Sequence, residues 1–508
     1  MRKYINKILI IAFTAALTVS CSDAYDIVQD GELSDEAVFR STSDLEKYLA
    51  GSVYTSIDTS NEIKFTSVFT DEVRLGPSNT GQDVGLHRFI LNSNDGYSSG
   101  IWLGYYTTIN RVNRLLEAAA KIVPTAGEQA GYNNILAEAR AVRALAYISL
   151  QSYYSTNMKD NNALGVILSD SVPGINDQLP RSTNGAIWSF VEADLQFAFD
   201  NINAAYQTTN GHASPFFVSK TMVNALRARM YTYRGNYTLA KQYALDVVNN
   251  SGLTLTLSTP NAPGTVGSTT WNNVFYSETA NPNPYRKIWN DTAPGESIFT
   301  LARLVGGTGG NIAALYTTNT TNITGSPLFA FGLNLFANLT SNTNDIRRYA
   351  FIDPTSTPAN NIYVIDKYPG KGNQPLKNNI KVIRLSEIYL ILAECEAQTS
   401  LTAAANYVKA VRDARKYSGS AAVPVYASKQ EALRDILKER RVELCFEGHR
   451  YVDLRRLGAE AAVSIDRNAA DDIITAPLTL SISDNRFTLP IPAAEINGNP
   501  TIQQNPGY

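Results

Sequence analysis

Cysteine, histidine and long apolar runs are all scarce in this chain of 508 residues. Three cysteines are too few for a disulfide framework, and the three histidines, His87, His212 and His449, lack the spacing of a metal site. Lys and Arg together number 44 against 46 Asp and Glu, and no basic patch is visible, which argues against a nucleic-acid partner. The composition therefore indicates no metal, no cofactor and no polyanionic partner.

The start of the chain has the pattern of an export signal. Basic residues precede an apolar run over residues 8–19, and the chain turns polar directly after Ser20-Cys21. The run is too short to span a bilayer, which takes about 20 residues, but it suits the core of a signal peptide. We expect residues 1–20 to be a lipoprotein signal peptide, Cys21 to be lipidated and residues 21–33 to form a tether. An ordinary cleaved signal with a chance cysteine is the alternative.

The other two cysteines, Cys395 and Cys445, lie in apolar helical surroundings. We expect them to be small buried hydrophobic residues, with a disulfide or a metal pair as the alternative. No segment after the signal is apolar over about 18 residues, so the rest of the chain is predicted to be soluble.

Apolar periodicity predicts that most of the remaining chain is helical. Helical spacing begins near Ser34, whereas residues 58–100 are rich in turn clusters and are predicted to be loop. Helices are then expected at about 101–123, 128–155, 184–204, 219–250, 384–417 and 428–447.

Small residues recur at nearly the same spacing in two of these segments, as in the paired helices of tetratricopeptide repeats. The first set is Ala228, Ala240, Ala244 and Val247, and the second is Ala393, Ala404, Val408 and Val411. The predicted fold is mainly α, a scaffold of tetratricopeptide-like helix pairs over 34–250 and 381–508 in a single domain, 34–508. An unrelated helical bundle is the alternative.

Residues 251–380 interrupt this scaffold and are rich in Gly, Pro, Asn, Thr and aromatic residues. Because disordered segments are poor in aromatics, we expect a large, irregular but ordered insertion of loops, short strands and small helices that carries the variable ligand-binding site. Its candidate binding residues are Trp271, Tyr276, Tyr285, Trp289 and Tyr316.

A second candidate region is the loop before the 101–123 helix, with Asp71, Arg74 and Tyr97. Rings of Tyr and Trp can stack on the C–H face of a sugar while polar groups bind its hydroxyls. For any single tryptophan, packing in the core is the competing interpretation.

The segment 439–458 alternates acidic and arginine residues. Arginine binds carboxylates through a planar fork, so we expect an ionic network that holds the last helices against the C-terminal tail. An acid/base pair formed by Glu443 and Glu447 is the catalytic alternative. It is disfavoured because arginine neighbours neutralise both carboxylates.

Two segments carry a resemblance to a known family. Residues 439–458, ERRVELCFEGHRYVDLRRLG, and the tail 489–508, which begins LPIPAAEI and ends QNPGY, resemble the corresponding segments of SusD/RagB proteins. Shorter matches lie at 109–113, 137–144 and 383–390, so the resemblance spans nearly the whole chain apart from the insertion.

The resemblance implies an outer-membrane nutrient-binding lipoprotein of Bacteroidetes that faces the cell exterior and is not an enzyme. Such proteins capture oligosaccharides or polysaccharides and pass them to a SusC-like TonB-dependent barrel. Peptide capture in the same architecture, as in RagB-like branches, is the first alternative. A surface glycosidase and a pure helical scaffold that binds other proteins are the others.

Overall fold

The computed structural model describes residues 38–307, 311–316, 327–356, 362–471 and 477–508. The predicted signal peptide, Cys21 and the tether lie outside these residues. Within the described part of the chain, no helix combines the length and the apolar character that crossing a membrane requires.

Helices dominate the first half of the molecule, and the predictions near 101–123, 128–155 and 184–204 are confirmed by α7, α8 and α9. The helices of this half are α3 (Thr42–Tyr48), η2 (Leu49–Val53), α4 (Tyr54–Ser56), α5 (Ser60–Phe69), α6 (Val84–His87), α7 (Gly96–Ala119), α8 (Gln129–Tyr154), α9 (Asn184–Asn201), α10 (Ala204–Asn210), α11 (Lys220–Tyr233) and α12 (Tyr237–Asn250).

The prediction that residues 58–100 are all loop is wrong because α5 lies within them. This helix buries polar as well as apolar residues, among them Glu62, Thr66 and Ser67 next to Ile63 and Phe65. A helix surrounded by protein has no polar face and therefore lacks the periodicity that marks a surface helix.

The predicted helix pairs are confirmed. Helices α11 and α12 pack on each other, as do α17 (Leu385–Glu396) and α18 (Leu401–Arg415), and α12 contacts α17, so that the two pairs are neighbours. All eight small residues of the repeat are buried: Ala228, Ala240, Ala244, Val247, Ala393, Ala404, Val408 and Val411. Their small side chains allow the helices to approach closely.

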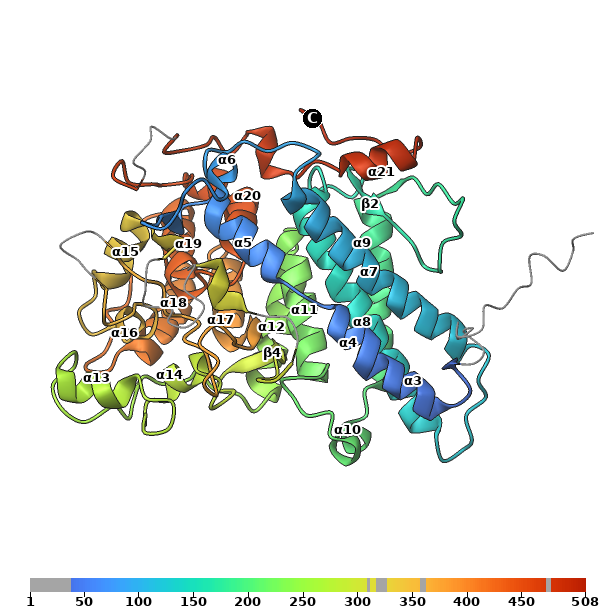
Figure 1. Ribbon diagram of the computed structural model, residues 1–508, viewed down its shortest axis with the longest axis horizontal. Helices are drawn as coiled ribbons and strands as arrows, with labels where there is room; N and C mark the ends of the chain where they lie inside the picture. The colour runs from blue at the N-terminus through green and yellow to red at the C-terminus, as the bar shows by residue number, and fades with distance from the viewer. Residues whose placement is uncertain (1–37, 308–310, 317–326, 357–361, 472–476) are drawn as a thin grey trace, which may run out of the picture.

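Two helices and an irregular tail follow these pairs. They are α19 (Lys429–Glu443), α20 (Arg450–Ala461), and within the tail η5 (Asn485–Phe487) and α21 (Ala493–Gly498). In Figure 1 α11, α12 and α17 lie between the N-terminal helices α3, α7, α8 and α9 on one side and α18 and α19 on the other.

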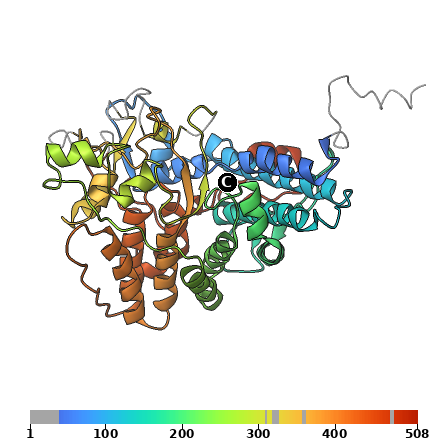
Figure 2. The ribbon, with the colours of Figure 1, turned by 90° about the horizontal axis from the view of Figure 1, so that it is seen from below.

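The described residues of the insertion form short helices and strands, as predicted. Its elements are α13 (Thr269–Phe275), α14 (Pro284–Trp289), β4 (Ser297–Leu301), η3 (Ile312–Leu315), β5 (Phe329–Phe331), α15 (Leu333–Thr340), α16 (Arg347–Ala350) and β6 (Ile380–Arg384). Figure 2 shows its yellow-green elements against the orange helices of the C-terminal half.

The strands form three antiparallel pairs: β1 (Val73–Leu75) with β5, β2 (Leu164–Ile167) with β3 (Arg181–Thr183), and β4 with β6. The β4–β6 pair brings two distant parts of the insertion together directly before α17. The β1–β5 pair joins the insertion to the loop before α7.

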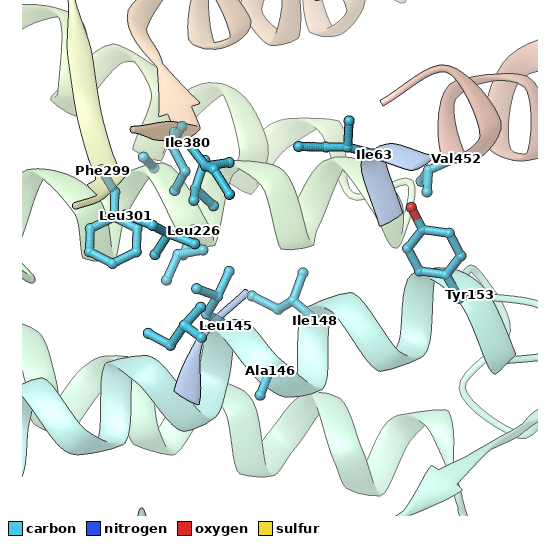
Figure 3. Close-up of a cluster of buried hydrophobic side chains, with 14 of the residues drawn as sticks. Ile63, Leu145, Ala146, Ile148, Tyr153, Leu226, Phe299, Leu301, Ile380 and Val452 are labelled. Carbon is cyan, nitrogen blue, oxygen red and sulfur yellow. The ribbon is translucent and has the colours of Figure 1, made fainter. Parts of the chain in front are cut away.

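Apolar side chains from both halves meet in one core. Figure 3 shows one cluster of buried apolar side chains. It includes Ile148 of α8, Leu226 of α11, Phe299 of β4, Ile380 of β6 and Val452 of α20. All of these residues are buried. The insertion strands are therefore part of the scaffold core and are not a separate layer on its surface.

A buried ionic network connects the insertion to the last helices. Glu443 of α19 accepts hydrogen bonds from Arg384 of β6 at 2.8 Å, from Arg415 of α18 at 2.9 Å and from Arg347 of α16 at 3.0 Å. Glu296, next to β4, binds Arg384 and Arg415 at 2.8 Å each. Burial alone would raise the pKa of Glu443, but the three guanidinium groups hold that pKa well below its usual range.

The predicted network therefore exists, but its main partner is not the tail. Glu447 binds Arg384 at 2.8 Å and Lys367 at 2.7 Å, both from residues that precede α17. The block also contacts the tail, through bonds from Arg455 to the Thr488 hydroxyl at 3.1 Å and from the Tyr451 hydroxyl to the Arg486 carbonyl at 2.9 Å. Sequence spacing identified the charges correctly but could not identify the partners.

Candidate ligand-binding site

The insertion rings that were predicted to face solvent are mostly buried. Trp271, Tyr285 and Trp289 are 0% exposed and Tyr316 is 3% exposed. The prediction that these four residues contact a ligand is therefore wrong for this conformation, because no ring face is open. Trp271, for example, stacks on Phe275 at 4.2 Å between ring centroids.

Trp289 and Tyr285 pack against the cations of the ionic network. The Lys367 ammonium lies 4.5 Å and the Arg384 guanidinium 5.2 Å from the Trp289 ring centroid, while Arg415 lies 4.4 Å from that of Tyr285. The electron-rich face of an aromatic ring attracts a cation and keeps water away from it. These rings are thus used to bury charge.

Tyr276 is the insertion candidate that stays partly exposed. Its hydroxyl donates to the Tyr349 carbonyl at 2.9 Å, and Arg286 lies 5.1 Å from its ring centroid. Tyr349 and Tyr417, both partly buried, lie near each other at 6.3 Å. Tyr276 remains a candidate at the edge of this aromatic group.

Asp71 of the second region is also buried, with 2% of its surface exposed. Arg450 donates to both carboxylate oxygens at 2.9 Å, and Arg441 lies 3.4 Å away. Burial would raise the pKa of Asp71, but these two arginines hold it well below its ordinary value. With both oxygens engaged, Asp71 connects α20 to the end of α5 and is wrongly predicted as a ligand contact.

Arg74 and Tyr97 of the same region are only partly buried. Arg74 lies in β1 opposite Ala330, and its charge lowers the pKa of Asp471 against the raising effect of burial. Directly after β1, Gly76 lies so close to the insertion that an added Cβ would be 2.1 Å from the Pro327 carbonyl oxygen. Only glycine allows this approach.

Tyr97 lies in the first turn of α7 beside charged and polar groups. The Lys64 ammonium is 5.6 Å from the Tyr97 ring centroid and forms an ion pair with Asp83 at 3.0 Å. Asn79 lies in the same loop as Asp83 and donates to the Gln82 carbonyl at 2.9 Å. We refer to Lys64, Asn79, Asp83 and Tyr97 as the Tyr97 face.

The tail holds the segments on either side of this face, the end of α5 and the stretch between α6 and α7. Arg467 donates to the carbonyls of Val68 at 3.1 Å, Phe69 at 2.9 Å and Thr70 at 2.7 Å, and also to that of His87. Two further bonds from the tail reach the carbonyls of Phe89, from Arg486, and of Ser93, from the Ala493 amide. The sequence analysis missed Lys64 and Asp83, because their proximity to Tyr97 depends on α5.

The two candidate regions do not merge into one site. Tyr97 contacts Lys64, whereas the insertion rings pack on one another and on the ionic network. The surface that best matches the predicted chemistry is the Tyr97 face, where a ring, two charges and an amide lie on the outside of the molecule.

Glu443 and Glu447, the catalytic alternative, are both ionised and paired. Burial would raise the pKa of Glu447, but Arg384 and Lys367 lower it to about 2. A general acid needs a pKa near the working pH, which neither carboxyl has.

In the described part of the chain no group of three or more His, Cys, Asp or Glu side chains could hold a metal ion. Cys395 and Cys445 are free and buried, as predicted.

A second buried acid, Glu62, lines a cavity of about 50 Å³ together with His449. Burial raises the pKa of Glu62 to about 8 and lowers that of His449 to about 4, so both are neutral near pH 7. Tyr105 donates a hydrogen bond to Glu62. The cavity has room for little more than a water molecule or two, so no substrate can reach these groups.

The chain is similar to SusD proteins. The SusD family model matches residues 336–508. SusD-like protein P2 of Formosa agariphila is 24% identical over the full length of both chains, and a SusD-like protein of Bacteroides ovatus is 27% identical over 49% of this chain and 45% of its own.

Solved structures show the same fold. A SusD superfamily protein of Bacteroides thetaiotaomicron aligns with a TM-score of 0.73 at 24% identity, covering 92% of this chain and all of its own. A laminarin-binding SusD-like protein aligns with a TM-score of 0.65 at 21% identity, with the same coverage of both chains.

Because the Trp289 side chain is buried, we expect Trp289→Ala to destabilise the fold and not to remove a ligand contact. Removing a fully buried indole leaves a cavity and exposes the charges that it shields, with an expected loss of about 3–5 kcal/mol. Denaturant unfolding followed by circular dichroism measures the change. An unchanged midpoint combined with weaker ligand binding would restore Trp289 as a site residue.

Glu62→Gln should make stability less dependent on pH. The folded-state pKa of about 8 lies above the ordinary value of 4.5, so the protonated acid stabilises the fold below about pH 4.5, and this contribution is lost as the pH rises towards 8. Glutamine stays neutral and should be more stable than wild type at pH 9 by on the order of 1–3 kcal/mol. Melting curves at pH 5 and pH 9 test this, and equal differences at the two pH values would contradict it.

Proposed function

We propose that this SusD-like protein binds glycans at the cell surface without cleaving them and delivers them to a SusC-like TonB-dependent transporter in the outer membrane. The observation that carries the proposal is the Tyr97 face, where the partly exposed Tyr97 ring lies 5.6 Å from the Lys64 ammonium, which in turn pairs with Asp83 at 3.0 Å. A laminarin-binding protein and a Bacteroides vulgatus structure described as a putative sugar-binding protein share the fold.

The Tyr97 face has the groups that a sugar needs. The ring offers an apolar surface for the C–H face of a pyranose, and the stacking contributes about 0.5–1.5 kcal/mol beyond buried area. Asp83 can accept hydrogen bonds from sugar hydroxyls while the Lys64 ammonium donates them. A few such contacts give dissociation constants on the order of micromolar to millimolar, weak enough for release to a transporter.

The tail makes this face rigid before any ligand arrives. Arg467 binds the carbonyls of Val68 and Phe69 at the end of α5, the helix that carries Lys64, and Arg486 binds that of Phe89, so little conformational entropy is lost on binding. The side chains of Lys64 and Asp83 are likewise held by their ion pair. Preorganisation of this kind compensates for a small contact area.

Truncation of the ring tests the proposal. We expect Tyr97→Ala to weaken glycan binding by about 2- to 10-fold and Tyr97→Phe to leave it nearly unchanged, because stacking needs only the ring. Calorimetry on the full chain in detergent, with laminarin, other β- and α-glucans, mannan and a peptide mixture, measures this. Tyr132→Ala, a partly buried tyrosine on α8, is the matched control.

Three outcomes would overturn the proposal. Glycan binding that is equal in Tyr97→Ala and wild type would remove the Tyr97 face as the site. Binding of peptides in place of glycans would favour the RagB-like alternative. Shortened products from a bound glycan would show a glycosidase.

We propose that Cys21 anchors the protein to the outer membrane through acyl chains, facing the cell exterior. The support is the apolar run at 8–19 followed directly by the polar stretch after Cys21. Two or three acyl chains anchor a protein stably, since each buried methylene contributes about 0.8 kcal/mol.

The Cys21→Ser variant should move from the membrane fraction to the soluble fraction and lose the mass of the lipid. Fractionation with mass spectrometry of the intact protein checks both. A Cys395→Ser variant, which changes a buried cysteine, is the control that should stay lipidated. Membrane retention of Cys21→Ser with an unmodified mass would refute the anchor.

A further inference from the structure

A cleft of about 230 Å³ lies between α7, the loop that follows β2, and α21, close to the C-terminus. Its lining side chains are Tyr106, Ile109 and Asn110 from α7, Ile167, Ser169, Pro173, Asp177 and Leu179 from β2 and its loop, and Glu495 and Asn499 from the α21 segment. Figure 1 shows α7, β2 and α21 gathered at one corner of the molecule. None of these residues belongs to the Tyr97 face.

Tyr106 and Glu495 are held in fixed positions in this cleft. The Tyr106 hydroxyl donates to the Ile167 carbonyl at 2.9 Å, and the ring packs against Trp102 with 4.7 Å between centroids. The buried Trp102 in turn donates from Nε1 to Glu495 Oε2 at 3.1 Å. The indole thus positions both the ring and the carboxylate of the cleft.

The walls of the cleft are also built from internal bonds. Asn499 donates to the Leu179 carbonyl at 2.7 Å, which joins the tail to the loop after β2. Within that loop the Gly174 amide donates to Asp177 at 2.7 Å. Asn110 accepts from Arg114 at 3.1 Å through its amide oxygen. The Asn110 amide N–H groups and the Glu495 Oε1 oxygen make no hydrogen bond within the described residues.

The charge and polarity of the residues that line the cleft indicate which class of ligand can bind there. Asp177 and Glu495 are acidic and no lining residue is basic, so an anionic ligand would be repelled. An apolar side chain of a protein partner would displace water from the two carboxylates without replacing the hydrogen bonds that this water makes. A ligand with an apolar face and several hydroxyl donors satisfies both the Tyr106 ring and the carboxylates.

We propose that this cleft is a second glycan-binding point that takes one uncharged pyranose unit. The volume limits the ligand to about one sugar ring, because sites for drug-sized ligands are larger, at about 300–1,000 Å³. The Tyr106 ring stacks on the sugar, Glu495 Oε1 accepts from its hydroxyls and the Asn110 amide donates to them. The inference shares its ligand class with the proposed function but does not depend on the Tyr97 face.

Two binding points on one chain change how a polymer is held. Once one sugar unit of a long glycan is bound, the second binding step takes place at a high effective concentration. A polysaccharide that reaches both points is then retained more tightly than a monosaccharide. Each single contact stays weak and exchanges quickly.

The test uses saturation-transfer NMR on the full chain in detergent, with glucose, galactose, mannose and N-acetylglucosamine as neutral probes and glucuronic acid and glucosamine as charged ones. We expect at least one neutral sugar to bind with a millimolar dissociation constant. Tyr106→Ala and Glu495→Gln should each weaken that binding about 3- to 10-fold, and Tyr106→Phe should not. Tyr97→Ala measures the other face separately, and Leu103→Ala, an exposed α7 residue outside the cleft, is the control.

The outcomes separate this cleft from the Tyr97 face. Loss of neutral-sugar binding in Tyr106→Ala but not in Leu103→Ala supports the cleft, whatever Tyr97→Ala does. Binding that only Tyr97→Ala weakens, or no neutral sugar bound at all, overturns it. Preferential binding of glucosamine would show a site for cations, and preferential binding of glucuronic acid would contradict the charge argument. Equal melting temperatures of all variants establish that each is folded.

Discussion

The Glu443 carboxylate, held by three guanidinium groups in the interior, is the interaction on which the rest of the structure depends. Arg347, Arg384 and Arg415 come from α16, β6 and α18, so a single side chain of α19 joins the insertion to two scaffold elements. Burying so much charge is possible only because each group is paired. Removal of one partner from such a pair typically costs about 3–5 kcal/mol.

The aromatic richness of the insertion follows from this network. Trp289 and Tyr285 lie against Lys367, Arg384 and Arg415, where ring faces replace water around the cations. A segment that composition alone presents as a binding surface is thus largely a support for buried charge. The two proposed ligand-binding surfaces are instead in the N-terminal half, beside α7.

Both candidate surfaces on α7 are completed by the C-terminal tail. Arg467 binds the end of α5, which carries Lys64, and Arg486 binds Phe89 before α7, while Glu495 lines the cleft of Tyr106. The tail therefore packs against both proposed sites, although nearly the whole chain separates it from the N-terminal helices. A rigid helix with the tail packed along it is well suited to weak, fast binding of sugars.

The sequence by itself determined most of the helices, the repeat of small residues in α11–α12 and α17–α18 and the resemblance to SusD proteins, because periodicity and motifs are local properties of the chain. It placed Tyr97 in the loop before a helix, whereas Tyr97 lies in the first turn of α7. Only the tertiary structure decided that Trp289 is buried, that Asp71 belongs to Arg450 and that Lys64 reaches Tyr97. Exposure and charge pairing depend on residues hundreds of positions away, and no local pattern of residues contains that information.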